Sequence, residues 1–246
     1  MTKVLSGLYL LYAGSVFILL MFITLPFIII STSLFSSLTG RRMGIFFLRC
    51  WAWGFSLITF YWVSTKNKAN VNKTQAHIYV GNHGSYLDAI AVCISIPQCF
   101  SPLGKIEMTK IPIFGSIYKR VVVMIDRNDK ESRAQSVLSL KNEIAKGQSI
   151  LIFPEGTMNK TTDLLAPFYD GAFKIAIETQ TPIQPFVILN NRKLLSRTAP
   201  FTAHPGLLTT VFLPAVAVEG YDIDNVDGLK KRVFEMMEEA LSVVST

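Results

Sequence analysis

The chain begins with two long apolar stretches and then alternates between short apolar runs and amphipathic segments. No charged side chain occurs from Val4 to Gly40, and only Arg49 interrupts a second apolar stretch from Met43 to Thr65. A helix that spans a bilayer needs roughly 20 such residues. Because Leu8–Ile30 is apolar on nearly every side, it has no polar face to turn toward water. The pattern predicts an N-terminal membrane anchor of two helical segments over residues 1–65.

The flanks of this anchor indicate how it lies in a membrane. Its first segment is too long for a removable signal peptide and lacks an early cleavage site of small residues. Lys3 precedes the first apolar stretch of the anchor, and Lys66, Lys68 and Lys73 follow the second. The positive-inside rule therefore predicts that both ends lie on the cytoplasmic side of the cell (inner) membrane. Whether the segments span the bilayer or lie in one leaflet stays open, and two buried helices of a soluble core are the alternative.

After a polar linker over residues 66–75, short apolar runs alternate with helical patterns. The runs predict strands at residues 77–80, 121–125, 149–153, 183–189 and 207–213. Helical patterns cover residues 85–95, 129–146, 170–180 and 227–244. Alternation of this kind is typical of an α/β fold with a largely parallel sheet flanked by helices. We expect residues 70–246 to form this second domain.

A histidine and a carboxylate come together in the stretch from Val80 to Asp88. An apolar run ends at Gly81, so His83 falls in a turn between a predicted strand and a predicted helix. The two groups can pair only if His83 precedes the helix and Asp88 lies in its first turn. The carboxylate would then fix the tautomer and leave the other imidazole nitrogen free to take a proton. The alternative is a capping box, in which Ser85 caps the helix and Asp88 returns to the Ser85 amide.

Polar residues follow two further predicted strands. Asp126 and Arg127 come after one strand, and Glu155, Gly156 and Thr157 come after another. Because the carboxyl ends of strands form the ligand crevice of an open α/β sheet, these segments and His83 are expected to converge. The sequence therefore predicts one site at this edge of the sheet.

Composition narrows the classes of partner. The net charge is +7, but no nucleic-acid-binding motif is present, so a basic surface on a membrane-anchored chain is better explained by anionic lipid headgroups. Cys50, Cys93 and Cys99 lie in apolar surroundings without metal-ligand or disulfide spacing. The three histidines are too scattered to form a recognisable zinc motif. No metal and no nucleic acid are expected.

Four blocks occur in an order that a known family shares. They are Asn82–Asp88, Lys105–Gly115, Ile125–Arg127 and Phe153–Thr157, and the shorter segments Asp170–Lys174, Pro182–Pro185 and Pro205–Gly206 also fit. Over residues 70–220 they resemble the glycerolipid acyltransferases with an HxxxxD box, the lysophosphatidic acid acyltransferases in particular. The family reaction moves a fatty acyl group from a thioester to the sn-2 hydroxyl of lysophosphatidic acid, giving phosphatidic acid in phospholipid biosynthesis.

The resemblance implies a role for each matching residue. Its catalytic residues are His83 and Asp88, and its substrate-binding residues are Arg127, Glu155, Gly156, Thr157 and Lys105. His83 would be the general base, and turn amides around Gly84 or Gly156 are candidate donors to the oxyanion. The expected partners are the membrane bilayer, a lysophospholipid acceptor, and an acyl-carrier-protein or coenzyme A thioester as donor. No further cofactor is implied.

The chain departs from the family pattern in two places. Val121–Val123 replace a glycine usual before the third block, and Met158 stands where a basic residue usually follows Glu-Gly-Thr. That residue is associated in the family with the substrate phosphate, so Arg127, Lys160 or Lys105 would have to replace it. Another lysolipid, such as a lyso-aminolipid, is the alternative acceptor.

Two other function classes remain at this stage. A thioester or lipid hydrolase usually carries a Gly-x-Ser-x-Gly elbow, which is absent here. A non-catalytic membrane scaffold would not need the four polar residues His83, Asp88, Arg127 and Glu155 together.

Overall fold

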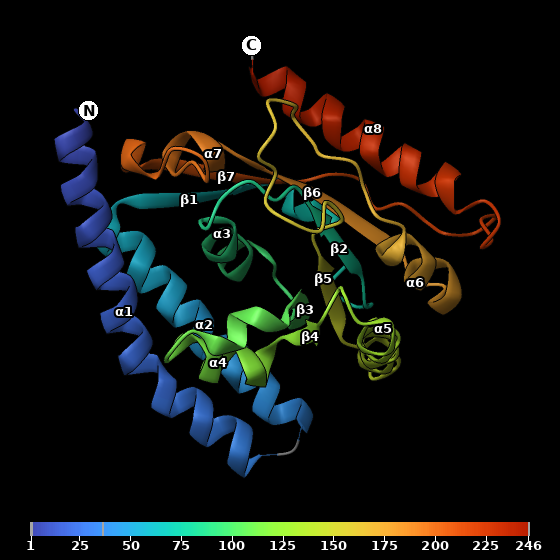
Figure 1. Ribbon diagram of the computed structural model, residues 1–246. Helices are drawn as coiled ribbons and strands as arrows, with labels where there is room; N and C mark the ends of the chain where they lie inside the picture. Colours follow the sequence, from blue (N-terminus) through green and yellow to red (C-terminus); the bar gives the residue numbers. More distant parts are fainter. Residues whose placement is uncertain (1, 36, 246) are drawn as a thin grey trace.

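The computed structural model describes residues 2–35 and 37–245, which form a seven-stranded sheet with helices on both faces (Figure 1). The strand order is β1-β7-β6-β2-β5-β3-β4. The strands are β1 (Tyr61–Lys66), β2 (Ile78–Gly81), β3 (Phe100–Lys105), β4 (Val123–Ile125), β5 (Ser149–Ile152), β6 (Ile183–Leu189) and β7 (Gly206–Phe212). Neighbouring strands are parallel except β6 and β7. The predicted α/β fold with a largely parallel sheet is confirmed.

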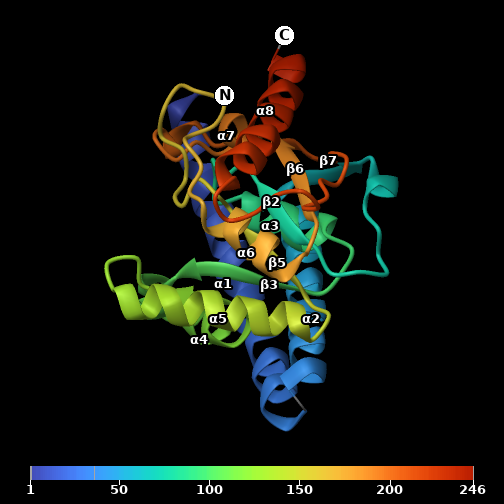
Figure 2. The same ribbon diagram turned by 90° about the vertical axis from the view of Figure 1, so that its right-hand side faces the viewer.

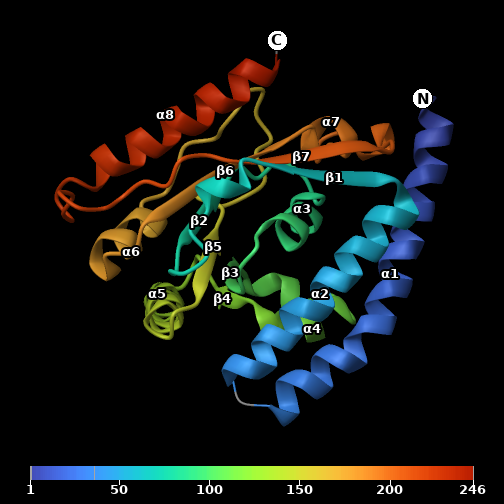
Figure 3. The same cartoon turned by 180° about the vertical axis from the view of Figure 1, so that it is seen from behind.

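Helices cover the two faces of the sheet in two groups. Their bounds are α1 (Lys3–Leu34), α2 (Ser37–Thr59), α3 (Asp88–Ser95), α4 (Phe114–Val121), α5 (Lys130–Ala145), α6 (Gly171–Thr179), α7 (Asn191–Leu194) and α8 (Val226–Ser245), with single 3₁₀ turns at Lys68–Asn70, Ile106–Lys110 and Pro200–Thr202. Figure 3 shows α5, α6 and α8 on one face and α3, α4 and the α1–α2 hairpin on the other.

The period-two alternation of the central strands explains this layering. In β2, Ile78 and Val80 belong to the core under α5, α6 and α8, whereas Tyr79 belongs to the core under the other group of helices. Successive side chains of a strand point to opposite faces, so a strand between two helical layers must be apolar on both. All seven residues of β6 are buried.

The N-terminal prediction needs a correction. Both apolar segments are helical, but of the described residues only α1 forms a helix long and apolar enough to cross a membrane. The physical reason is that α2 carries three arginines, which make it less apolar than α1, and two of them bond to the rest of the fold. Arg49 donates two hydrogen bonds of 2.7 Å to the carbonyls of Ile96 and Gln98, beyond α3. Figure 2 shows the hairpin extending past α4 and α5.

Several elements differ from the sequence expectations. The apolar run 121–125 divides between the end of α4 and the short strand β4. Strands β1 and β3 and helices α4 and α7 were not predicted, and the expected domain boundary at residue 65 falls inside β1. Strand β1 pairs with β7 along its whole length, so residues 61–66 are part of the sheet.

Candidate active site

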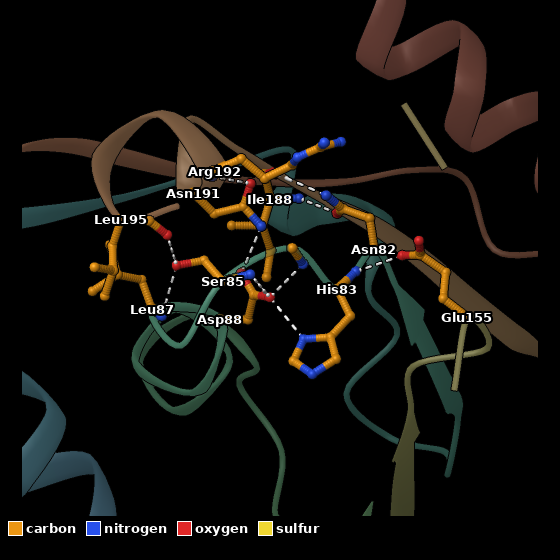
Figure 4. A network of polar contacts seen from close by, with 11 residues as sticks. Asn82, His83, Ser85, Leu87, Asp88, Glu155, Ile188, Asn191, Arg192 and Leu195 are labelled. Atoms are coloured by element: carbon orange, nitrogen blue, oxygen red, sulfur yellow. Dashed lines mark hydrogen bonds and ion pairs between the residues drawn. The ribbon is translucent and has the colours of Figure 1, made fainter. Parts of the chain in front are cut away.

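His83 and Asp88 form a close pair at the end of β2. His83 Nδ1 lies 2.8 Å from Asp88 Oδ2, and the Asp88 side chain is fully buried while that of His83 is 22% exposed. His83 precedes α3 and Asp88 is the first residue of α3, as pairing over five residues requires. In Figure 4 the imidazole extends away from the turn, with Nδ1 facing Asp88 and the Nε2 edge directed elsewhere. The ring stacks on Phe153, with centroids 4.3 Å apart.

The same carboxylate holds the turn closed. Asp88 Oδ2 also accepts hydrogen bonds from the backbone N–H groups of Gly84 at 2.8 Å and Ser85 at 2.9 Å. The hydrogen bond from the Ser85 N–H to Asp88 is the contact that the capping-box alternative predicted. Asp88 Oδ2 therefore makes this contact and the contact with His83 at the same time. Ser85 itself is not the cap, because α3 begins three residues later with Leu87 at the N-cap position.

Asn82 fixes the base of this turn to strand β6. Its Nδ2 donates to the Ile188 carbonyl at 3.1 Å, and its Oδ1 accepts from the Ile188 N–H at 2.7 Å. This two-way bond satisfies both backbone groups of a buried strand residue. The turn that carries His83 is therefore bonded to two neighbouring strands, one through the chain and one through this side chain (Figure 4).

Glu155 joins the loop after β5 to the turn that carries His83. Its Oε1 accepts from the His83 N–H at 2.6 Å and its Oε2 from the Ala166 N–H at 2.8 Å. The residue is 3% exposed, and burial raises its pKa while the two N–H donors partly offset that rise. Both carboxylate oxygens thus bind backbone. The resemblance implies a substrate-binding role for Glu155, and in the structure its carboxylate connects two loops.

Gly156 and Arg127 lie next to Glu155. Arg127 Nη1 donates to the Gly156 carbonyl, and burial lowers the pKa of Arg127, with Tyr169 and Glu107 opposing the shift. Gly156 has φ +72°, and a Cβ there would come within 2.7 Å of the Tyr169 ring. Only glycine suits both conditions. A guanidinium has five N–H donors, so one bond to a carbonyl leaves others for a ligand.

The remaining residues implied by the resemblance are more exposed. Lys105 is exposed at the end of β3, where its backbone pairs with Ile125. Thr157 and Lys160 are exposed on the loop after β5, and Met158 between them is half-buried. Asn159 of this loop donates its N–H to the His83 carbonyl at 2.7 Å, which keeps the loop beside the turn that carries His83.

Asn191 is a site residue that the sequence reasoning missed. It begins α7, directly beyond β6, and its Nδ2 donates to Asp88 Oδ1 at 2.6 Å. The sequence does carry a signal for it, because ligand sites form at the carboxyl ends of strands, and this rule identifies the polar residues after the other central strands. Applying it to the strand predicted at 183–189 would have indicated Asn190 and Asn191.

Both glycine amides considered as oxyanion donors already have partners. The Gly84 N–H bonds to Asp88, and the Gly156 N–H bonds to the Phe153 carbonyl at 3.0 Å. Across residues 2–35 and 37–245, no group of three or more His, Cys, Asp or Glu side chains is arranged to hold a metal ion. The arrangement provides an oriented imidazole that can accept a proton. The Arg127 guanidinium bonds to the same loop that Glu155 joins to the His83 turn.

Comparison with known proteins places these features in a family context. The chain matches the Acyltransferase family over residues 62–189. That range runs from the second residue of β1 to the end of β6 and includes every site residue described above except Asn191.

Several curated relatives are named 1-acyl-sn-glycerol-3-phosphate acyltransferase. The Salmonella typhimurium protein is 30% identical over 184 residues, which cover 73% of each chain. The Limnanthes douglasii protein is 28% identical over 182 residues, 73% of this chain and 64% of that one. The alpha enzyme of Mus musculus is 30% identical over 179 residues, 70% of this chain and 61% of that one. The match thus spans less than two thirds of the plant and mouse relatives.

A solved structure shares the fold over almost the whole chain. The crystal structure of the 1-acyl-sn-glycerophosphate (LPA) acyltransferase from Thermotoga maritima superposes with a TM-score of 0.76, covering 98% of this chain and 96% of that one. The two sequences are 18% identical, so the likeness concerns the fold.

Proposed function

This chain belongs to the acyltransferase family, and we propose that it moves a fatty acyl group from an acyl thioester to the sn-2 hydroxyl of lysophosphatidic acid, giving phosphatidic acid. The observation that carries the proposal is the imidazole of His83, held at Nδ1 by the buried carboxylate of Asp88 and partly exposed. The names of the curated relatives support the choice of acceptor.

The proposed mechanism needs one base and no covalent enzyme intermediate. With Nδ1–H donated to Asp88, His83 Nε2 is the acceptor nitrogen and takes the proton of the lysolipid hydroxyl as its oxygen attacks the thioester carbonyl. The carbon–sulfur bond then breaks, and the thiolate leaves with the bonding electrons and takes the proton from the imidazolium. A positioned base of this kind typically contributes about 10²–10⁴-fold.

The base is tested by substitution of the pair. Membranes that contain the protein are incubated with labelled acyl-coenzyme A or acyl carrier protein and a panel of lysolipids. We expect His83→Ala to abolish transfer, because it removes the base, and Asp88→Asn to lower kcat by about 10⁴-fold through the wrong tautomer. Retention of more than a few per cent of activity by His83→Ala would contradict the mechanism. Release of free fatty acid without acylated lipid would indicate a hydrolase instead.

Arg127 is the proposed cation for the phosphate of the acceptor. It is half-buried at the carboxyl end of the sheet, and its hydrogen bond to the Gly156 carbonyl connects it to the loop that carries Glu155. A phosphomonoester carries between one and two negative charges near neutral pH, and the guanidinium fork suits its oxygens. Lys160 is the second candidate, because it lies next to Asn159, which bonds to the backbone of His83.

Met158 supports a second acceptor without a phosphate, such as a lyso-aminolipid, since it is not basic. Kinetics on lysophosphatidic acid and on a phosphate-free lysolipid separate the two. Loss of a charge-assisted contact should lower the preference for lysophosphatidic acid by roughly 10- to 150-fold in Arg127→Ala or Lys160→Ala. Lys130→Ala, at the exposed start of α5, is the control. An unchanged preference in both test variants would favour the phosphate-free acceptor.

The proposed location is the cytoplasmic side of the cell membrane, with α1 in the lipid. The long apolar α1 and the lysines at residues 3, 66, 68 and 73 support this orientation. A single-tailed acceptor and a two-tailed product both reside in the bilayer, so an enzyme that acts on them benefits from a fixed position at its surface.

A further inference from the structure

The buried carboxylate of Asp88 accepts a fourth hydrogen bond, and its donor lies outside the turn that carries His83, directly after strand β6. Three donors reach Oδ2 from the catalytic turn, namely His83 Nδ1 and two backbone N–H groups. The other oxygen, Oδ1, accepts from Asn191 Nδ2 at 2.6 Å. Figure 4 shows Asn191 approaching Asp88 from the side opposite to the imidazole.

The amide of Asn191 is itself held in one orientation. Its Oδ1 accepts the Arg192 N–H at 2.8 Å, so Nδ2 is the end that faces Asp88. The residue is 3% exposed and begins α7, while the preceding Asn190 adopts φ +66°. These restraints leave the Asn191 side chain little freedom to rotate away.

The hydrogen bond from Asn191 to Asp88 matters because both side chains are out of contact with water. Asp88 is fully buried, so an oxygen without a donor would carry the full cost of desolvation. A carboxylate bonded at Oδ2 alone could also rotate about its Cβ–Cγ bond and change the direction of its contact with the imidazole. The Asn191 bond removes that rotation and directs Oδ2 at His83 Nδ1.

We propose that Asn191 is a positioning residue, which holds the Asp88 carboxylate so that His83 keeps the tautomer with Nε2 free. The role in catalysis rests on the proposed function, in which His83 is the base. The effect on the imidazole itself does not depend on which substrate the protein takes.

The first test replaces the donor with an apolar side chain of similar size, Asn191→Leu. Loss of one hydrogen bond to a charged group should lower kcat by about 10- to 100-fold and leave KM for both substrates within about twofold. Asn190→Gly is the matched control, because glycine keeps the positive φ, and the exposed amide that it removes bonds to the Leu207 carbonyl rather than to Asp88. It should keep wild-type kcat.

A spectroscopic measurement separates positioning from a general structural role. The chain has three histidines, so ¹⁵N-histidine labelling in detergent micelles gives a small set of ring signals that a His83→Gln sample assigns. We expect wild-type His83 to show one tautomer, protonated at Nδ1, and Asn191→Leu to show a mixture. Unchanged His83 signals in Asn191→Leu, or a kcat within about threefold of wild type, would overturn the proposal.

Asn191→Asp provides a near-isosteric variant in case the leucine variant does not fold. A proton shared between the introduced carboxyl group and Asp88 restores the bond at low pH, whereas loss of that proton leaves two carboxylates in contact. The neighbouring titratable groups are His83, which bonds to Asp88, and Glu155, which interacts electrostatically with Asp88. The Arg192 guanidinium bonds to the carbonyls of Thr161 and Asp163.

The ratio of kcat between Asn191→Asp and wild type should therefore fall as pH rises, and a pH-independent ratio would contradict the proposal. If wild type transfers no acyl group, the proposed function fails. The ¹⁵N comparison then still decides whether Asn191 positions the imidazole.

Discussion

At the scale of single residues, the candidate site is a set of side chains that bond to backbone as much as to one another. Asn82 binds both backbone groups of Ile188, and Glu155 binds the N–H groups of His83 and Ala166. Buried polar groups need such partners, and here the partners are strand β6 and the loops that carry His83 and Ala166. The turn around His83 is therefore shaped by residues that need not touch a substrate.

Glu155→Gln tests this structural use of a buried carboxylate. Glutamine has one acceptor oxygen and one NH₂ group, so one of the two N–H donors would face another donor. We expect the free energy of unfolding to fall by about 1–3 kcal/mol and activity to fall with it, because His83 loses a backbone restraint. Thermal unfolding in detergent measures the change. Glu178→Gln is the control, since that carboxylate is 39% exposed and pairs with Lys141.

The same variant should change the pH dependence of stability. Burial raises the pKa of Glu155 above its ordinary value of 4.5, so the folded protein binds that proton more tightly than the unfolded chain. The contribution of Glu155 to stability is then greatest at low pH and declines as pH rises from 4.5 toward the raised pKa. The stability difference between wild type and Glu155→Gln should narrow over that window. A difference that widens would contradict the assigned direction.

At the scale of elements, local pattern located most of the sheet and missed the elements whose pattern is ambiguous. Strand β6 matches its predicted bounds, because its mostly apolar run of seven residues is buried along its whole length. Strand β3 contains Pro102 and Gly104, which both argue against a strand in sequence. Glycine at position 104 leaves room for the Tyr118 hydroxyl group, which a Cβ there would overlap. That close approach depends on α4 and has no local signature.

The partners of the polar residues were equally out of reach of local reasoning. The sequence pointed to a pair of His83 and Asp88 because both lie in one short turn. Asn191 contacts Asp88 from 103 residues away, and Arg41 on α2 contacts Glu143 on α5. Contacts of this kind follow from strand order, which the pattern of apolar residues does not specify.

Arg41→Ala tests whether α2 is bonded to the sheet domain. Arg41 Nη1 lies 3.2 Å from Glu143 Oε2 and 2.7 Å from Ser101 Oγ, and Glu143 is 8% exposed. Removal of the guanidinium leaves a largely buried carboxylate short of a donor, so we expect the free energy of unfolding to fall by about 1–3 kcal/mol. Arg42→Ala removes an exposed neighbour and should stay within about 0.5 kcal/mol. Equal effects of both variants would mean that the Arg41 contact adds nothing.

At the scale of the whole molecule, the N-terminal hairpin and the sheet share one apolar core. Met21 and Ile28 of α1 belong to the same buried cluster as Phe186 of β6 and Phe212 of β7. The hairpin therefore acts as a layer over one face of the sheet as well as a candidate anchor. A helix with both tasks should have two chemically similar faces that differ in what covers them.

The exposed face of α1 is where that difference can be measured. Leu19 is 60% exposed and Phe22 is 55% exposed, whereas Ile28 on the same helix is fully buried. If lipid covers the exposed face, the double variant Leu19→Asp/Phe22→Asp should lose binding to phosphatidylcholine vesicles, because each carboxylate costs about 2.5–3.5 kcal/mol in the centre of a bilayer. Its thermal unfolding in detergent should change little. Ile28→Ala should show the reverse, with unchanged vesicle binding and a loss of about 2–5 kcal/mol in stability. Flotation of the two variants in a density gradient decides the matter, and full flotation of the double variant would mean that this face of α1 does not lie in lipid.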